Sequence, residues 1–203
     1  MKKNLKRVVI CALITAGVWS WGLICDRQTL RNEILRLHVV ASSDSRSDQA
    51  VKLRVRDAVL ESISEDLRNV GDIDQAREYI RENLPKIEEA ANKALEALGC
   101  QDRAVATLKE ELFDKRVYDT FSLPAGIYES LRITIGSGEG KNWWCVAFPT
   151  LCIPATSEGF EDVAVSAGFS ETLTKTLEGE YEIRFYLLDL LGKLEGILFN
   201  SGN

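Results

Sequence analysis

Residues 34–59 read ILRLHVVASSDSRSDQAVKLRVRDAV, and this stretch decides the fold because its hydrophobic periodicity changes partway along. In the first part, apolar and polar positions alternate, and one face carries Leu35, Leu37 and Val39. That period of two predicts a β-strand over residues 33–40, which ends in a run of small polar residues. Beyond this turn, apolar residues recur every four positions, which predicts a helix over residues 48–68 with Ser47 as its N-cap.

The rest of the chain extends this pattern to one α+β fold. An apolar stripe predicts a second helix over residues 73–98, with Pro85 expected to kink or split it. Turn residues then separate short strands, predicted over residues 105–113, 117–123, 128–135, 142–148 and 181–188. The strands over 128–135 and 142–148 are close enough in sequence to form an antiparallel hairpin. We therefore predict two helices packed on an antiparallel β-sheet.

The N-terminus indicates export. Residues 8–25 are 18 positions without a charge, a helix of about 27 Å against a hydrocarbon core of about 30 Å. The cations that precede this run keep the N-terminus in the cytoplasm and place the remainder outside. Two interpretations stay open: a cleaved signal peptide, or a single transmembrane anchor that contacts the membrane through residues 8–25. The anchor is favoured because the bulky end of the run is a poor cleavage site.

We accordingly divide the chain into three parts. Residues 1–25 are the signal peptide or anchor. Residues 26–155 together with 181–199 form the extracytoplasmic α+β domain, and the polar residues 156–180 form an insertion or loop.

Charge and composition exclude some functions. The 203 residues carry a net charge of −6, and removal of the four cations in residues 1–25 leaves 21 basic and 31 acidic residues, or −10. Such an acidic body argues against nucleic acid, because phosphate binding needs a cationic surface. The sole histidine, His38, lies within a predicted strand, and no nucleophile signature accompanies it. We expect no catalytic residue, cofactor, metal or small-molecule substrate.

Three cysteines belong to the exported part: Cys100, Cys145 and Cys152. Cys145 and Cys152 are seven positions apart, and a disulfide between them is permitted in an oxidising compartment. The alternatives are pairing of Cys145 with Cys100, or two half-buried thiols. A zinc site would need ligands that one histidine cannot supply.

Two adjacent tryptophans, Trp143 and Trp144, follow a glycine-rich turn that ends with Gly140 and Asn142. The turn lacks the spacing of a phosphate-binding loop, so we interpret it as a hairpin turn. Adjacent residues of a strand point to opposite faces, so one tryptophan can enter the core while the other faces outward. An exposed tryptophan at such a turn is typical of a protein-interface anchor, with core packing as the alternative for either residue.

Several of these strings together resemble the stage II sporulation protein R family of endospore-forming bacteria. The resemblance covers about residues 34–152 and the segment EIRF at 182–185. It rests on LHVVASSDS (37–45), DQAVK (48–52), VRDAV (55–59), LPAGIYE (123–129), LRI (131–133), IG (135–136) and GKNWWCVAFP (140–149).

The resemblance implies a function that composition alone does not. Family members are exported from the forespore into the space between two membranes. There they activate the sigma-E processing peptidase, a mother-cell membrane aspartic protease that cleaves pro-sigma-E, and they have no catalysis of their own. The partner-binding candidates are the turn residues Ser43, Asp44, Ser45, Pro124 and Gly126 together with Gly140, Asn142, Trp143 and Trp144, which we expect to converge on one rim. The alternative is an envelope hydrolase that uses a carboxylate pair.

Overall fold

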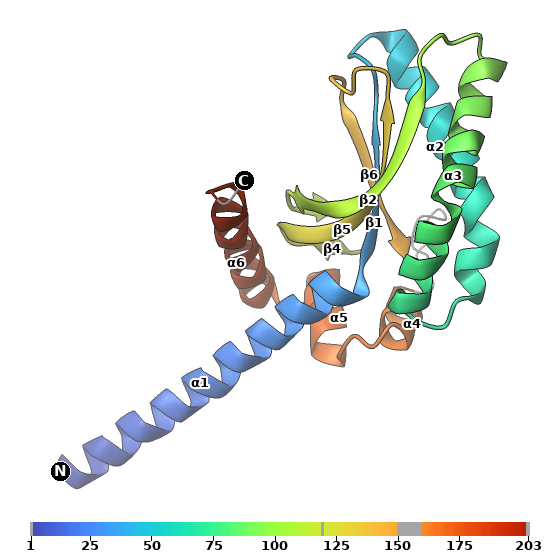
Figure 1. Ribbon diagram of the computed structural model, residues 1–203. Coiled ribbons are helices and arrows are strands. Elements are labelled where there is room, and N and C mark those ends of the chain that lie inside the picture. The colour runs from blue at the N-terminus through green and yellow to red at the C-terminus, as the bar shows by residue number, and fades with distance from the viewer. Residues whose placement is uncertain (1, 119, 150–159, 202–203) are drawn as a thin grey trace.

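The computed structural model describes residues 2–118, 120–149 and 160–201 (Figure 1). Its elements in chain order are α1 (Lys2–Glu33), β1 (Leu35–Val40), α2 (Arg46–Asn69), α3 (Ile73–Ala97), β2 (Ala104–Phe113), β3 (Arg116–Val117), β4 (Ser122–Leu123), β5 (Gly126–Ile135), β6 (Asn142–Phe148), α4 (Phe160–Ser166), α5 (Glu171–Glu178) and α6 (Glu182–Ser201). Helices and a mostly antiparallel sheet make up the fold, as the sequence predicts.

The main sheet has the strand order β2-β5-β1-β6. β1 pairs in parallel with β5 and antiparallel with β6, so the predicted hairpin between β5 and β6 is wrong. All six residues of β1 are buried, and this strand therefore takes a central position between the two strands that were expected to pair with each other. The single strand predicted over residues 117–123 is also wrong, because this segment contains two short strands, β3 and β4, which pair with each other in a separate sheet.

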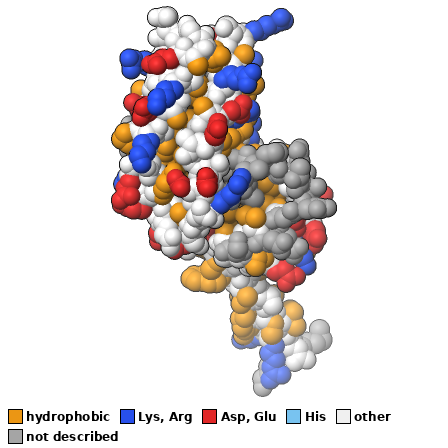
Figure 2. Space-filling model, turned by 90° about the vertical axis from the view of Figure 1, so that its right-hand side faces the viewer, with side chains coloured by type: hydrophobic (Ala, Val, Ile, Leu, Met, Phe, Trp, Pro, Cys, Tyr) orange, Lys and Arg blue, Asp and Glu red, His pale blue; other side chains and the backbone are white. Residues whose placement is uncertain are grey.

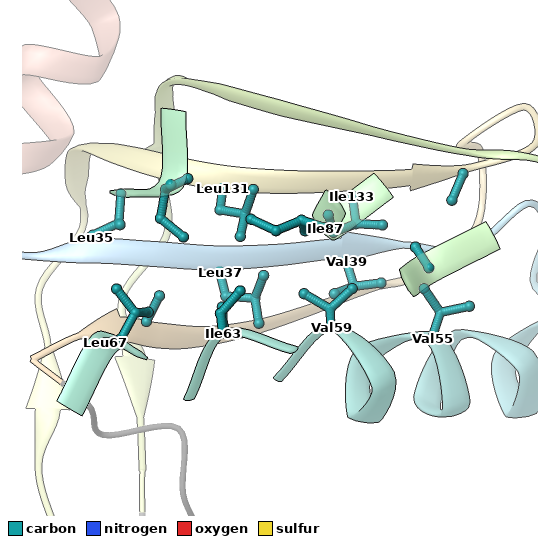
Figure 3. Packing of buried hydrophobic residues seen from close by; sticks show 14 of the residues in the cluster. Leu35, Leu37, Val39, Val55, Val59, Ile63, Leu67, Ile87, Leu131 and Ile133 are labelled. Atoms are coloured by element: carbon teal, nitrogen blue, oxygen red, sulfur yellow. The ribbon is translucent and has the colours of Figure 1, made fainter. Parts of the chain in front are cut away.

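Helices α2 and α3 cover one face of the sheet (Figure 1). The predicted strand face of Leu35, Leu37 and Val39 packs against Val55, Val59, Ile63 and Leu67 of α2 and against Ile87 of α3, as Figure 3 shows. Helix α2 begins earlier than predicted, since its N-cap is Ser45 and not Ser47. The Ser45 side chain accepts the backbone N–H of Asp48 at 3.0 Å, which satisfies one of the free amide groups at the helix start.

Helix α3 continues through Pro85 without splitting. Asp72 caps its first turn by accepting the backbone N–H of Gln75, and the Gln75 side chain in turn accepts the backbone N–H of Gly71. The buried residues on either side of the proline, Ile80 and Ile87, both stay in the core. Burial of this stripe outweighs the hydrogen bond that the proline removes.

Helices α4, α5 and α6 and the end of α1 pack together with the other face of the sheet. α4 and α5 lie within the segment interpreted as a polar insertion, and α6 replaces the strand predicted over residues 181–188. Phe185 and Leu188 line the buried side of α6 at helical spacing, so the short alternation in that window gave the wrong period. Gly192 lets α6 approach closely, because a Cβ there would lie 1.7 Å from the Ala125 carbonyl oxygen.

Helix α1 has two parts with different surroundings. Residues 4–21 extend away from the domain with exposed side chains, and Leu23, Asp26, Arg27 and Leu30 are buried against it (Figure 1). Among the helices of the described residues, α1 is the one that is both long enough and apolar enough to cross a membrane. It joins β1 with only Ile34 between them, so this span is connected directly to the centre of the sheet.

Candidate functional site

Two polar turns meet at the end of the sheet that is remote from α1. The first follows β1 at residues 41–45, and the second precedes β6 at residues 136–141. The Ala41 carbonyl accepts the backbone N–H of Gly140 at 2.9 Å, and the Ser42 carbonyl accepts the hydroxyl of Ser137 at 2.8 Å. We call the surface formed by residues 41–45 and 136–144 the distal rim.

Asp44 joins the two turns through its carboxylate. Its Oδ1 accepts the backbone N–H of Lys141 at 2.7 Å, and its Oδ2 lies 3.9 Å from the Lys141 ammonium. A Cβ on Gly140 would lie 2.3 Å from the Ser43 carbonyl oxygen, so only glycine permits this approach of the two backbones. The predicted convergence of residues 43–45 with residues 140–144 is therefore correct.

Side chains near the start of α2 form hydrogen bonds to both turns of the rim. Ser43 accepts the backbone N–H of Ser45, and the side chain of Gln49 donates to the Ser43 carbonyl at 2.9 Å. The buried Lys52 ammonium donates to the Lys141 carbonyl at 2.8 Å. Burial lowers the pKa of Lys52, partly offset by the Asp44 carboxylate. These contacts link both turns of the rim to the start of α2.

The two tryptophans lie on opposite faces of β6, as predicted, and each is half-buried. The Arg56 guanidinium lies over the Trp143 ring at 4.9 Å from its centre, on the α2 side. The Arg116 guanidinium lies over the Trp144 ring at 3.4 Å, on the other side. Neither ring is wholly in the core or wholly exposed, because an arginine covers part of each. Both could contribute aromatic surface to a partner at this edge strand.

The turn at residues 124–126 does not join the rim. β5 runs parallel to β1, so its first residue, Gly126, lies at the opposite end of the sheet from the rim, roughly 30 Å along the strand. The turn is buried there: the Ala125 backbone N–H donates to Asp189 of α6 at 2.8 Å, and the Pro124 carbonyl accepts the Tyr128 hydroxyl at 2.9 Å. The expected convergence of all three turns is therefore wrong, and Pro124 and Gly126 are buried at the opposite end of the sheet.

A charged cluster on the sheet was missed by sequence reasoning. His38 Nδ1 lies 2.9 Å from Glu111 Oε2, and Arg132 Nη1 lies 2.5 Å from Glu111 Oε1. Burial raises the pKa of Glu111, but the hydrogen bonds and charges of His38 and Arg132 outweigh it and bring the pKa down to about 2. These three residues come from β1, β2 and β5, so the pairing of distant strands brings them together. The one available signal was a lone histidine on a predicted strand, which no nucleophile signature accompanied.

The cluster resembles part of a catalytic site without the reacting group. Glu111 orients the imidazole, and His38 Nε2 is buried with no hydrogen-bond partner. Among the described residues, no hydroxyl or thiol is hydrogen-bonded to that nitrogen, as a nucleophile would be. Within the same residues, no group of three His, Cys, Asp or Glu side chains is placed to hold a metal ion.

Cys145 is disulfide-bonded, and Cys100 is free, which excludes the alternative pairing between those two. Cys152, the predicted partner, lies outside the described residues. The bonded cysteine follows directly after Trp144 on β6, so the covalent link restrains the strand that carries both tryptophans.

Comparisons with known proteins agree on one family. A family model described as stage II sporulation protein R matches residues 31–158. The stage II sporulation protein R of Bacillus subtilis (strain 168) is 38% identical over 128 residues, which make up 63% of this chain and 57% of that protein. The match thus spans little more than half the length of that relative. No solved structure matches the chain. The matched range contains the distal rim, whereas α4, α5 and α6 lie outside it.

Proposed function

This chain belongs to the stage II sporulation protein R family, and from that premise we propose that it is the signal that activates the sigma-E processing peptidase. The peptidase is a membrane aspartic protease of the mother cell, and its substrate is pro-sigma-E. The observation that carries the proposal is the family match, because it covers the whole β-sheet and the distal rim.

The first step is delivery across a membrane. The basic residues Lys2, Lys3, Lys6 and Arg7 precede the apolar part of α1 and favour a cytoplasmic N-terminus. The domain then lies outside the forespore, in the intermembrane space. Because Leu23, Asp26, Arg27 and Leu30 are buried in the domain, the end of α1 is part of the folded unit, which favours a retained anchor.

The position of the rim suits a partner on the opposite membrane. α1 enters the sheet at the first residue of β1, and the rim begins just after the last residue, Val40, about 20 Å further on. The rim therefore lies at the end of the sheet that is remote from α1 (Figure 1). It would face away from a membrane that holds α1. A protein in the mother-cell membrane would approach from that side.

Activation follows from differential binding. The peptidase has a resting and an active arrangement, and a ligand shifts that equilibrium only if it binds one of them more tightly. Exposed polar groups at Asp44, Ser45, Lys141 and Asn142 would set the orientation of the complex, and the half-buried faces of Trp143 and Trp144 would supply apolar contact. No chemical step is required of this chain.

The test expresses the peptidase and its precursor together in a non-sporulating cell, with and without this protein, and measures precursor cleavage. Cleavage should require the protein. Trp143→Ala and Trp144→Ala should each lower cleavage at least tenfold, the range expected when a central aromatic contact is truncated.

The matched control is Val117→Ala, because Val117 is an exposed apolar residue on β3, outside the rim. Circular dichroism of each variant confirms that it folds. The proposal is wrong if cleavage proceeds equally without the protein, and the rim assignment is wrong if both folded tryptophan variants keep full activity.

A further inference from the structure

Helix α6 is apolar on two opposite faces. Phe185 and Leu188 of one face are buried in the domain, and Gly192 lies against the turn before β5. The other face carries large apolar side chains at spacings of three and four residues. This set, here called the outer stripe, consists of Ile183, Tyr186, Leu190, Leu194, Ile197 and Leu198, all of which are exposed, Ile183 and Leu198 by 74%. A contiguous apolar surface of this kind marks a binding surface.

Two ion pairs show how α6 is oriented relative to α1. Asp26 pairs with Arg184 at 2.6 Å, and Arg27 pairs with Glu195 at 2.6 Å. Asp26 and Arg27 are neighbours on α1, whereas their partners are eleven positions apart on α6, about 16 Å along a helix axis. α6 therefore lies at a steep angle to α1 instead of running beside it, and the two helices are linked at residues 26–27. Figure 1 shows α6 directed away from the line of α1.

The residues of α1 that pair with α6, Asp26 and Arg27, directly follow the apolar span. Residues 8–25 carry no charge, and Asp26 is the first ionisable carboxylate beyond them. A span of about 27 Å fills most of the hydrocarbon core, so residues 26–27 lie where α1 leaves the bilayer. A helix that lies at a steep angle to α1 at this point lies close to the plane of the membrane surface.

The outer stripe points toward that membrane. The sheet lies beyond the C-terminal end of α1, because only Ile34 separates α1 from β1. α6 packs its buried face against this sheet, so its opposite face is directed back toward the exposed part of α1. Figure 1 shows α6 on the side of the sheet from which α1 projects, with α2 and α3 on the other side.

We propose that α6 is an interfacial helix that seats the domain on the outer leaflet of the membrane spanned by α1. The occupant of the outer stripe is thus the headgroup and upper acyl region of that leaflet. The inference rests on the retained anchor of the proposed function. Apolar surface on α6 then continues the lipid-facing surface of α1, and Tyr186 with Trp19 and Trp21 matches the aromatic residues that favour membrane interfaces.

The face formed by α2 and α3 differs. Acidic and basic side chains are mixed over it (Figure 2), as expected of a surface in water. Seating on α6 would hold the domain in one orientation, with the distal rim directed away from the bilayer. A domain that hung from a flexible linker would sample many orientations instead.

The experiment reconstitutes the full chain in vesicles of phosphatidylethanolamine and phosphatidylglycerol that contain a phospholipid with a diazirine on its acyl chain. Irradiation followed by mass spectrometry maps the lipid adducts. We expect adducts on residues 4–21 and on residues 182–198, the latter at least tenfold above the peptide around Val105, an exposed apolar residue of β2.

A variant with Leu190→Gln, Leu194→Gln and Ile197→Gln should lose the α6 adducts and keep those on α1, whereas Val105→Gln should change neither. If the triple variant does not fold, the wild-type map decides alone. Adducts on α1 with only background on α6 would overturn the inference and leave the anchor intact. Loss of adducts from both helices would overturn the anchor as well. Chain-to-chain cross-links at residues 182–198 without lipid adducts would assign the outer stripe to a second copy and also overturn the inference.

Discussion

The Glu111 carboxylate offers a sharp test of how the sheet is stabilised. It accepts from both His38 and Arg132, and its side chain is only 11% exposed. We predict that Glu111→Gln, which keeps the size of the side chain and removes its charge, destabilises the domain at pH 7 because two positively polarised partners then lack their counter-charge.

The magnitude follows from the pKa. A fall from 4.5 to about 2 corresponds to about 3 kcal/mol of preferential stabilisation of the ionised form, which solvent screening of this partly buried group reduces to about 2 kcal/mol. Because the folded-state pKa is depressed, this stabilisation is present above pH 4.5 and is lost as the pH falls toward 2. The difference between wild type and variant should shrink over the same interval.

The assay is urea unfolding of the full chain in non-ionic micelles, followed by far-UV circular dichroism between pH 7 and pH 2. Glu110→Gln is the matched control, since Glu110 is the preceding residue of β2 and its pair with Arg31 is exposed on both sides. It should cost about 0.5 kcal/mol or less. Equal costs for the two variants, or a cost for Glu111→Gln that does not depend on pH, would refute the reasoning.

Two further substitutions test other contacts. Gly140→Ala should destabilise the protein by about 1–3 kcal/mol and lower precursor cleavage, because the new Cβ would lie 2.3 Å from the Ser43 carbonyl oxygen. Gly71→Ala is the control, because a Cβ there would meet only the Gln75 side chain, at 3.6 Å. Equal precursor cleavage by the two variants would contradict the rim geometry. Arg184→Ala should lower the free energy of unfolding in urea by about 3 kcal/mol, because it leaves the buried Asp26 carboxylate without its partner. The end of α1 should then become accessible to protease. An unchanged unfolding midpoint would mean that this ion pair does not hold α6 to α1.

Local patterns in the sequence were sufficient for the elements whose periodicity is long or unambiguous. β1, α2, α3 and β6 lie close to their predicted bounds, since each pattern reports which residues of one segment must be buried. The window over residues 181–188 failed because eight residues fit both a period of two and a helical period. Only the longer run through Gly192, which packs against Ala125, distinguishes them.

The order of the strands in the sheet could not be predicted from the sequence. β5 and β6 are neighbours along the chain and are separated in space by β1, because the most completely buried strand occupies the interior of the sheet. The parallel pairing of β1 with β5 then places residues 124–126 at the wrong end for the rim and brings His38, Glu111 and Arg132 together. Pairing depends on contacts between distant segments, which periodicity within one segment does not report.

By itself, the sequence thus determined the long apolar N-terminal segment, the mixed helix and sheet composition, and the two turns of the rim. Each of these is a local property of charge, hydrophobic period or turn chemistry. Tertiary structure alone decided that the rim lies opposite α1, that the tryptophans are each covered by an arginine, and that α6 lies at a steep angle to α1 with an apolar face left exposed. These arrangements arise because burial of β1 between its neighbours fixes the direction in which every other element must pack.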